Sequence, residues 1–127
     1  MSDGGVFKAH GVKLTEFGGD PAEYEDWRFS FKSFVGMVQP AWIDILEAAQ
    51  VAERPLGNAG LSAEAITASK KLFYMLSSCS QGAARILLRK QAPGEGLEAW
   101  RQLHLRYSQS HPSAALGSLQ AALTLLA

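Results

Sequence analysis

Residues 20–40 read DPAEYEDWRFSFKSFVGMVQP, a stretch that predicts an amphipathic helix with a defined start and a defined end. Asp20 is suited to the N-cap, Pro21 to the first helical position, and Glu23 to returning a hydrogen bond to the cap. Pro40 ends the helix, because proline lacks an amide donor and its ring clashes with the preceding turn. Apolar residues at steps of three and four define the buried face: Tyr24, Trp27, Phe31, Phe34, Val35 and Val38.

Proline and glycine breaks separate the helices that follow. Pro40 can open a second helix, residues 51–60 predict an exposed loop, and Ser62 is suited to capping a third helix. A short fourth helix is expected over 83–91, a fifth after the next proline and glycines, and a sixth from about Pro112. The apolar stripes of the longer helices are Trp42, Ile45, Leu46 and Ala49; Ala65, Leu72, Leu76 and Cys79; Leu97, Trp100, Leu103 and Tyr107; and Leu116, Leu119, Leu123 and Leu126.

These elements predict an all-α fold: one compact domain of five to six amphipathic helices over residues 20–127, preceded by a loose arm at 1–19. Leu14 and Phe17 of the arm are expected to pack on the core. No alternating run of β-branched residues indicates a strand. The expected core anchors are the large side chains in the middle of the stripes: Tyr24, Trp27, Phe31, Trp42, Trp100, Leu103 and Tyr107.

Composition narrows the class of protein. Hydrophobic residues make up 47% of the chain and charged residues 19%, so there is enough apolar material to offset the entropy of ordering. No apolar run approaches the roughly 20 residues that cross a bilayer, and we expect no membrane partner. The single cysteine, Cys79, excludes an internal disulfide and a multi-cysteine zinc site. A cytoplasmic protein without a cofactor is the expectation.

The net charge of zero hides an asymmetry along the chain. Residues 1–64 contain 10 acidic and 5 basic residues, whereas residues 65–127 contain 2 acidic and 7 basic residues. The first part therefore carries −5 and the second part +5. These charges could neutralise each other inside one fold, match the opposite part of a neighbouring copy, or offer the basic part to RNA.

Several short motifs follow one another in a defined order: Phe17-Gly18, Tyr24 and Trp27 spaced by three, Trp42-Ile43, alanine-rich helices, Glu98-Ala99-Trp100-Arg101-Gln102-Leu103 leading to Arg106-Tyr107, and the leucine helix 116–126. In this order they resemble the capsid-type region of the Gag protein of copia-type LTR retrotransposons. The block at 99–107 looks like that family's A-W-x-x-L…Y motif. The likeness covers about residues 14–126, which is nearly the whole chain.

The resemblance implies a helical, capsid-like domain whose copies build a cytoplasmic particle around element RNA. The family's Cys-x-x-Cys zinc knuckle is missing, because Cys79 is alone, and no Asp-Ser/Thr-Gly protease motif, integrase or polymerase segment is present. The likeness therefore concerns the N-terminal structural part of a Gag-Pol polyprotein. Because the last helix is apolar to its end and lacks a C-cap, we expect a chain truncated from a longer parent.

Residue types that could support catalysis do not form a recognisable set. His10, His104 and His111 lack the spacing of a catalytic or metal-binding group. Cys79 with His104 is a conceivable nucleophile and base, but Cys79 falls on the apolar side of its helix. The turn before Asp20 resembles an anion site, yet the acidic residues of the first turn would repel phosphate. We therefore expect a protein that is not an enzyme.

The candidate interaction site is a basic cluster on the fourth helix. Arg85 and Arg89 are four residues apart and so share a helical face, and Lys90 follows directly. Such a patch can neutralise phosphates without reading sequence, but it can equally be a solvated surface, since no interleaved aromatic residues are evident to stack on bases. Cations that could extend it in space are Lys70, Lys71, Arg101 and Arg106.

Two functions stay open at this point. The first is a self-associating structural protein whose partners are its own copies, with weak RNA contact that is independent of sequence. The second is a helical adaptor, domesticated from such an element, that binds other proteins. Particles or oligomers that grow with concentration favour the first, and a monodisperse monomer favours the second.

Overall fold

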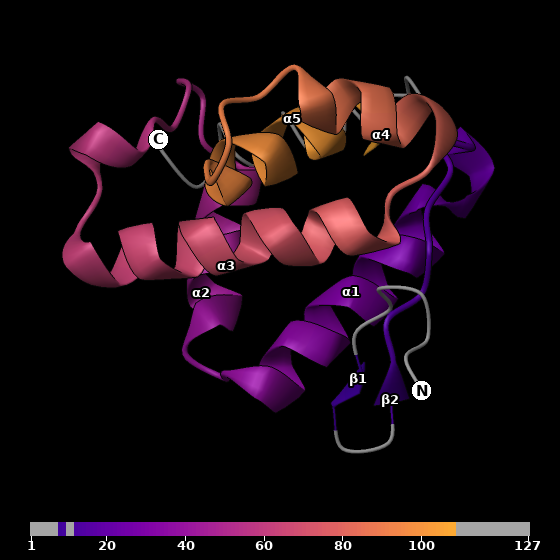
Figure 1. Cartoon of the computed structure of the whole chain (residues 1–127), viewed down its shortest axis with the longest axis horizontal. Helices are drawn as coiled ribbons and strands as arrows, with labels where there is room; N and C mark the ends of the chain where they lie inside the picture. The colour runs from indigo at the N-terminus through magenta and orange to yellow at the C-terminus, as the bar shows by residue number, and fades with distance from the viewer. Residues whose placement is uncertain (1–7, 10–11, 109–127) are drawn as a thin grey trace, which may run out of the picture.

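The protein is an α-helical domain, as predicted. A computed structural model describes residues 8–9 and 12–108, so the expected sixth helix at 112–126 lies outside the described residues. The helices of the described part are α1 (Tyr24–Val38), α2 (Trp42–Gln50), α3 (Ala63–Cys79), α4 (Gly82–Arg89) and α5 (Gly96–Ser108), with 3-10 turns η1 (Pro21–Glu23) and η2 (Asn58–Gly60) (Figure 1).

A small antiparallel hairpin precedes the helices. Strands β1 (Lys8–Ala9) and β2 (Val12–Lys13) pair Lys8 with Lys13 and Ala9 with Val12. The sequence analysis did not predict it, because strands of two residues are too short for alternating hydrophobicity to be recognised.

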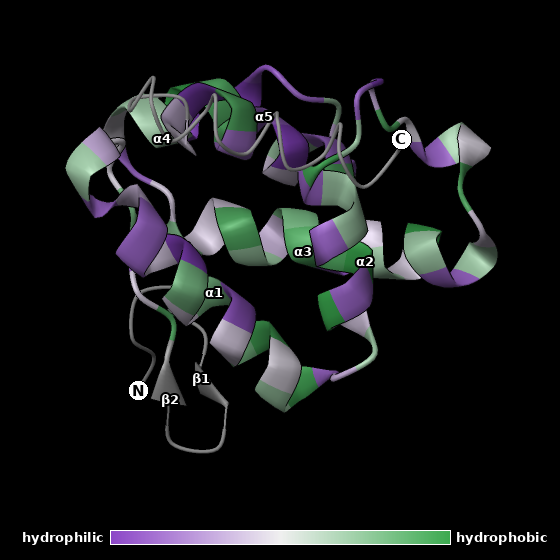
Figure 2. Cartoon of the chain, turned by 180° about the vertical axis from the view of Figure 1, so that it is seen from behind, coloured by the Kyte–Doolittle hydropathy of each residue, from purple (hydrophilic) through white to green (hydrophobic). Residues whose placement is uncertain are grey.

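Helix α1 follows the local signals with two differences. The Asp20 carboxylate accepts a hydrogen bond from the Ala22 amide at 3.0 Å, and the first turn is 3-10, so the α-helix begins at Tyr24. The helix ends at Val38, and Gln39 is extended, as the residue before a proline must be. Val38 is exposed, which contradicts its predicted place on the buried face, because the end of the helix runs past the core. Figure 2 shows hydrophilic and hydrophobic residues alternating around α1.

Helix α5 lies at the centre of the domain and contacts each of the other four α-helices. Its first six residues, Gly96 to Arg101, are all buried, so this half of the helix is enclosed on every side. Gly96 permits the close approach of α5 to α3. A side-chain carbon at Gly96 would overlap the Ser69 carbonyl oxygen and the Phe73 amide nitrogen.

The seven expected anchors are all buried: Tyr24, Trp27, Phe31, Trp42, Trp100, Leu103 and Tyr107. Trp100 is the centre of this group. Its ring stacks on Phe31 with 5.2 Å between ring centroids and lies 6.0 Å from Trp27, which joins α5 to α1. Its indole N–H donates to the Leu46 carbonyl oxygen at 3.1 Å, which joins α5 to α2. One side chain thus links three helices.

The segment before α1 is held by both backbone and aromatic contacts. Phe17 is buried, stacks on Trp27 at 4.9 Å and meets Tyr107 edge-on at 5.0 Å. The Phe17 amide donates to the Cys79 carbonyl, and the Phe17 carbonyl accepts from the Gln81 amide. Gly82 has a φ of +55°, and a side-chain carbon there would lie 2.8 Å from the Gly18 carbonyl oxygen. The chain before α1 is therefore fitted closely into the corner between α3 and α4.

Replacing Trp100 or Trp27 by alanine should lower the free energy of unfolding by about 3 to 5 kcal/mol, because each change removes buried contacts and leaves a cavity. Phe29→Ala is the matched control. Phe29 lies on α1 with 71% of its surface exposed, so its removal should change stability by no more than about 0.5 kcal/mol. Chemical denaturation provides the measurement, and equal midpoints for Trp100→Ala and Phe29→Ala would contradict the assignment.

Gly96→Ala should destabilise the domain by about 1 to 3 kcal/mol, because the added methyl group forces α5 away from α3. Elsewhere in a helix the same change is usually stabilising. Gly60→Ala is the control, since a side-chain carbon at Gly60 meets nothing within 4 Å. Thermal unfolding of the two variants should separate them, and a Gly96→Ala domain as stable as the parent would refute the close approach.

Candidate interaction surface on helices α3 and α4

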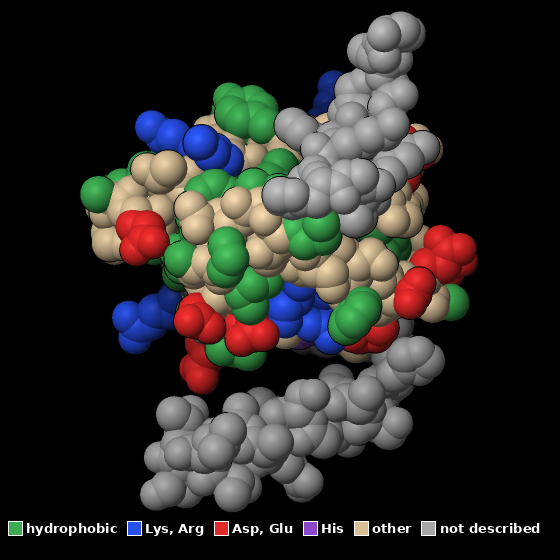
Figure 3. All heavy atoms as spheres, turned by 90° about the horizontal axis from the view of Figure 1, so that it is seen from below, with side chains coloured by type: hydrophobic (Ala, Val, Ile, Leu, Met, Phe, Trp, Pro, Cys, Tyr) green, Lys and Arg blue, Asp and Glu red, His purple; other side chains and the backbone are tan. Residues whose placement is uncertain are grey.

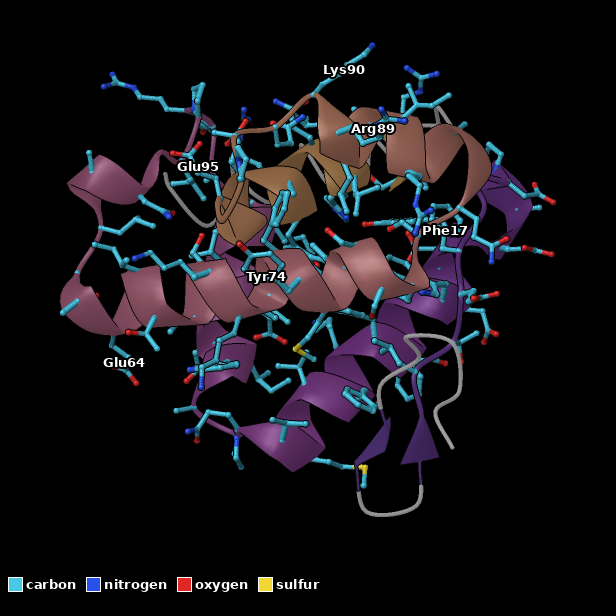
Figure 4. All side chains as sticks on the ribbon, viewed as in Figure 1. Phe17, Glu64, Tyr74, Arg89, Lys90 and Glu95 are labelled. Atoms are coloured by element: carbon cyan, nitrogen blue, oxygen red, sulfur yellow. The ribbon has the colours of Figure 1, made fainter. Side chains whose placement is uncertain are left out.

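The five predicted cations are all exposed, and they come from two helices. Arg85 and Arg89 lie on α4, Lys90 is the residue that follows it, and Lys70 and Lys71 lie on α3. Figure 4 shows Arg89 and Lys90 on the upper side of the molecule and Tyr74 on α3 below them. All five cations are therefore available to a partner, but they do not share one site.

The two arginines line a surface groove between α3 and α4, which we call the α3–α4 groove. It has a volume of about 300 Å³ and is formed by Phe73 and Ser77 of α3 and Arg85, Leu88 and Arg89 of α4. Leu88 is buried and Phe73 is partly buried, so the floor is apolar. The Arg85 guanidinium donates to the Ser77 carbonyl oxygen at 3.2 Å, which holds the arginine against α3. The result is an apolar floor with two cations along one edge.

The lysines lie outside this groove. Lys90 points away from α3 (Figure 4). The Lys70 side chain passes Gly94, with its Cγ 3.6 Å from where a side-chain carbon would stand, so it lies beside the connection from α4 to α5. Lys71 is exposed and does not line the groove. The structure therefore brings Arg85 and Arg89 together and leaves the three lysines at separate places.

Aromatic residues beside the groove were not identified from the sequence. Phe73 lines it, and Tyr74, with 59% of its surface exposed, meets Phe73 edge-on at 5.6 Å. The expectation from the sequence concerned only aromatic residues interleaved with the cations, and these two lie on the neighbouring helix. The signal in the sequence was the position of Phe73 and Tyr74 beside the stripe that includes Leu72 and Leu76.

Arg101 is a second correction, since it was considered as an extension of the basic cluster. It is buried on α5, where its guanidinium donates two hydrogen bonds to the Glu98 carboxylate at 2.9 and 3.0 Å. The same carboxylate accepts from the Gln102 side chain and from the Leu56 amide. Burial alone would raise the pKa of Glu98, but these hydrogen bonds outweigh it and hold the pKa below its ordinary value. The pair fastens the loop before η2 to α5.

The conceivable nucleophile and base are both uncharged at neutral pH. Cys79 is buried, and burial raises the pKa of its thiol to about 12, so the reactive thiolate is not available. The His104 ring lies 3.2 Å from the Tyr24 hydroxyl oxygen, and burial together with the nearby Arg28 lowers its pKa to about 4. The thiol therefore lacks the thiolate that a nucleophile needs, and the lowered pKa makes the neutral His104 ring a weak base.

Other chemical sites receive no support from the described residues. Residues 12–108 and the short strand at 8–9 contain no cluster of three potential metal ligands among His, Cys, Asp and Glu. Before α1, the Ala22 amide already donates a hydrogen bond to the Asp20 carboxylate, so this amide is not free to bind an anion. In the same part of the chain, no helix has the length and apolar character needed to span a bilayer.

The ion pairs of the described residues each stay within one part of the chain. Arg28 pairs with Glu25 at 2.6 Å and Lys32 with Glu47 at 3.0 Å, all in residues 1–64, whereas Arg101 pairs with Glu98 in residues 65–127. Seen from below, the side of the molecule that carries α1 and α2 shows acidic groups on either side of a basic one (Figure 3). These pairs therefore do not neutralise the acidic part against the basic part.

Comparison with known proteins adds no relative: no protein-family model, no curated protein and no solved structure matches this chain. The chemistry of the surface and the fold thus carry the functional argument.

The free energy of unfolding should fall as the pH drops from about 6.5 toward about 4, because the folded state holds His104 neutral while the unfolded state takes up the proton. The stabilisation from Glu98 is present above its ordinary pKa of 4.5 and is lost only as the pH falls below that value, since its folded pKa is lowered. The window between pH 6.5 and 4.5 therefore reports on His104. Urea unfolding across this window should give a flatter profile for His104→Gln, and an unchanged profile would contradict the assignment.

Proposed function

We propose that this chain is a non-enzymatic structural module, a capsid-like region similar to that of copia-type Gag proteins, that associates with copies of itself. The observation that carries the proposal is the separation of charge. Each ion pair of the described residues joins two residues of the same part, either the acidic first part or the basic second part. The excess negative charge of the first part and the excess positive charge of the second part therefore stay available to a neighbouring copy.

Unlike patches on one molecule make a head-to-tail contact. Such a heterologous contact can propagate into rings or open lattices, whereas a two-fold contact closes on itself as a dimer. A shell needs contacts that propagate. The exposed groove with Arg85 and Arg89 is the most localised feature of the basic part and is our candidate for one side of this contact.

The residues that carry the family resemblance support a shared fold. Tyr24 and Trp27 of the first motif and Trp100 and Tyr107 of the second are more than seventy positions apart in the sequence. In the structure Tyr24 stacks with Tyr107 at 5.9 Å and Trp27 lies 6.0 Å from Trp100. The two motifs are thus the two sides of one core contact, a physical reason for their occurrence together.

RNA is the second partner that we propose, bound weakly and without sequence preference in a cytoplasmic particle. Arg85, Arg89 and Lys90 are exposed and can each neutralise a phosphate. Tyr74 provides an exposed ring near the two arginines, on which a base could stack. No cofactor is part of the proposal.

An adaptor domesticated from a Gag protein is the second candidate. The feature that favours it is the apolar floor of the α3–α4 groove, which could accept a segment of another protein as readily as one of a second copy. The two candidates differ in what the purified chain does alone.

Light scattering of the purified, nuclease-treated chain at increasing concentration should show an average mass that rises with concentration and falls with salt. Raising sodium chloride from about 0.1 M to about 1 M shortens the Debye length from about 10 Å to about 3 Å, which screens exposed charges, whereas an apolar contact would hold. Changing Arg85 and Arg89 to glutamate should lower the mass further.

Association that ignores both salt and the charge reversal would contradict the electrostatic contact. A monomer at every concentration would instead support the adaptor.

A further inference from the structure

Helix α1 presents an exposed aromatic ring that the described residues leave largely uncovered. Phe29 is 71% exposed, although its neighbours Trp27 and Phe31 are buried. It borders a hollow formed with Arg28, Lys32, Ser33 and Ile43, but the exposed fraction shows that most of the ring stands clear of these residues. A large apolar side chain in this position is the kind of residue that dominates protein contacts.

Two acidic side chains lie beside this ring, whose hollow is also lined by the Arg28 and Lys32 side chains. Asp26 is exposed and lies one helical turn before Phe29, and Glu25, also exposed, lies four residues before it. Side chains three or four residues apart on a helix are neighbours, so both carboxylates stand beside the ring. Glu25 forms an ion pair with Arg28, whereas none of the described residues forms an ion pair with Asp26. We call Phe29, Asp26 and Glu25 the α1 knob.

The α3–α4 groove has the complementary properties. Its floor of Phe73 and Leu88 can receive an aromatic ring, and its volume of about 300 Å³ is at the lower end of the range for small-molecule pockets. Arg85 and Arg89 are four residues apart and both line the groove, so two positive charges lie close to its apolar floor. An arginine can also pack on the face of an aromatic ring.

We propose that the α1 knob of one copy inserts into the α3–α4 groove of the next copy, with Phe29 on the apolar floor and Asp26 facing Arg85 and Arg89. This inference rests on the proposed function and specifies its contact. The knob belongs to the acidic part and the groove to the basic part, so the contact is heterologous and a pair of copies keeps one free knob and one free groove. Chains of copies follow from it directly.

The apolar floor separates this contact from RNA binding. A contact with phosphate requires only a cation, and the exposed side chains of Lys70, Lys71 and Lys90 would provide one as well as the two arginines do. Only an apolar partner gains from Phe73 and Leu88, and only a partner with a negative charge gains from the two arginines. The acidic knob with its aromatic ring meets both requirements.

The first test compares two exposed apolar residues. Phe29→Ser should weaken self-association about tenfold or more, measured by sedimentation of the full, nuclease-treated chain across a range of concentrations. Val38→Ser is the control, because Val38 is also exposed, at 45%, but is the last residue of α1 and lies beyond the knob along the helix. Both variants should melt like the parent. Equal association of Phe29→Ser and Val38→Ser overturns the proposal.

A charge control belongs to the groove. Arg85→Glu with Arg89→Glu should weaken association at least as much as Phe29→Ser. Lys71→Glu with Arg106→Glu changes the net charge equally at exposed positions outside the groove and should have a smaller effect. If only total charge matters, the two double variants will behave alike and the proposed contact is overturned.

Mixing provides the decisive result. The Phe29→Ser chain keeps its groove, and the Arg85→Glu, Arg89→Glu chain keeps its knob, so an equal mixture should form a heterodimer that does not grow further, detected by light scattering. A mixture that stays monomeric while the parent associates overturns the proposal and leaves self-association standing. A parent that is monomeric throughout overturns the proposed function as well. The Arg85→Glu, Arg89→Glu chain is also tested for binding to an RNA oligonucleotide. If this chain loses RNA binding but associates like the parent, the groove belongs to RNA and the proposal is overturned.

Discussion

The burial of the Trp100 indole is the constraint on which the rest of the structure depends. A buried indole N–H must find an acceptor, and here it donates to the Leu46 carbonyl in the middle of α2. The ring itself is covered by Phe31 of α1, and Trp27 adds a second aromatic contact. Because these contacts come from two other helices, one side chain of α5 holds both α1 and α2 against it.

The central position of α5 then determines what the surface contains. With α5 enclosed, α3 can approach it only where Gly96 removes the side chain, and Arg101 is buried against Glu98 instead of joining the basic surface. The remaining cations of the second part lie largely on α3 and α4, whereas α1 and α2 carry exposed carboxylates of the first part.

The core of this protein and the proposed contact between copies are formed by different residues. The aromatic residues on which the resemblance to copia-type Gag proteins rests are core residues, and Tyr24, Trp27, Trp100 and Tyr107 meet in one cluster. The residues of the proposed contact are Phe29, Asp26 and those of the α3–α4 groove, none of which belongs to the motifs.

The sequence by itself determined where the helices begin and end, because those signals are local. Asp20, Pro40, Ser62 and the break before Gly96 act through their own backbone neighbours, and the apolar stripes follow from helical spacing alone. The position of Arg85 and Arg89 on one face of α4 was also predictable, because residues four apart are about one helical turn apart.

Only the tertiary structure decided which faces are covered. Three features depend on how closely other helices approach: the burial of Arg101, the exposure of Val38, and the groove that Phe73 and Leu88 line from two helices. The spacing of residues within one helix gives no information about the distance to another helix.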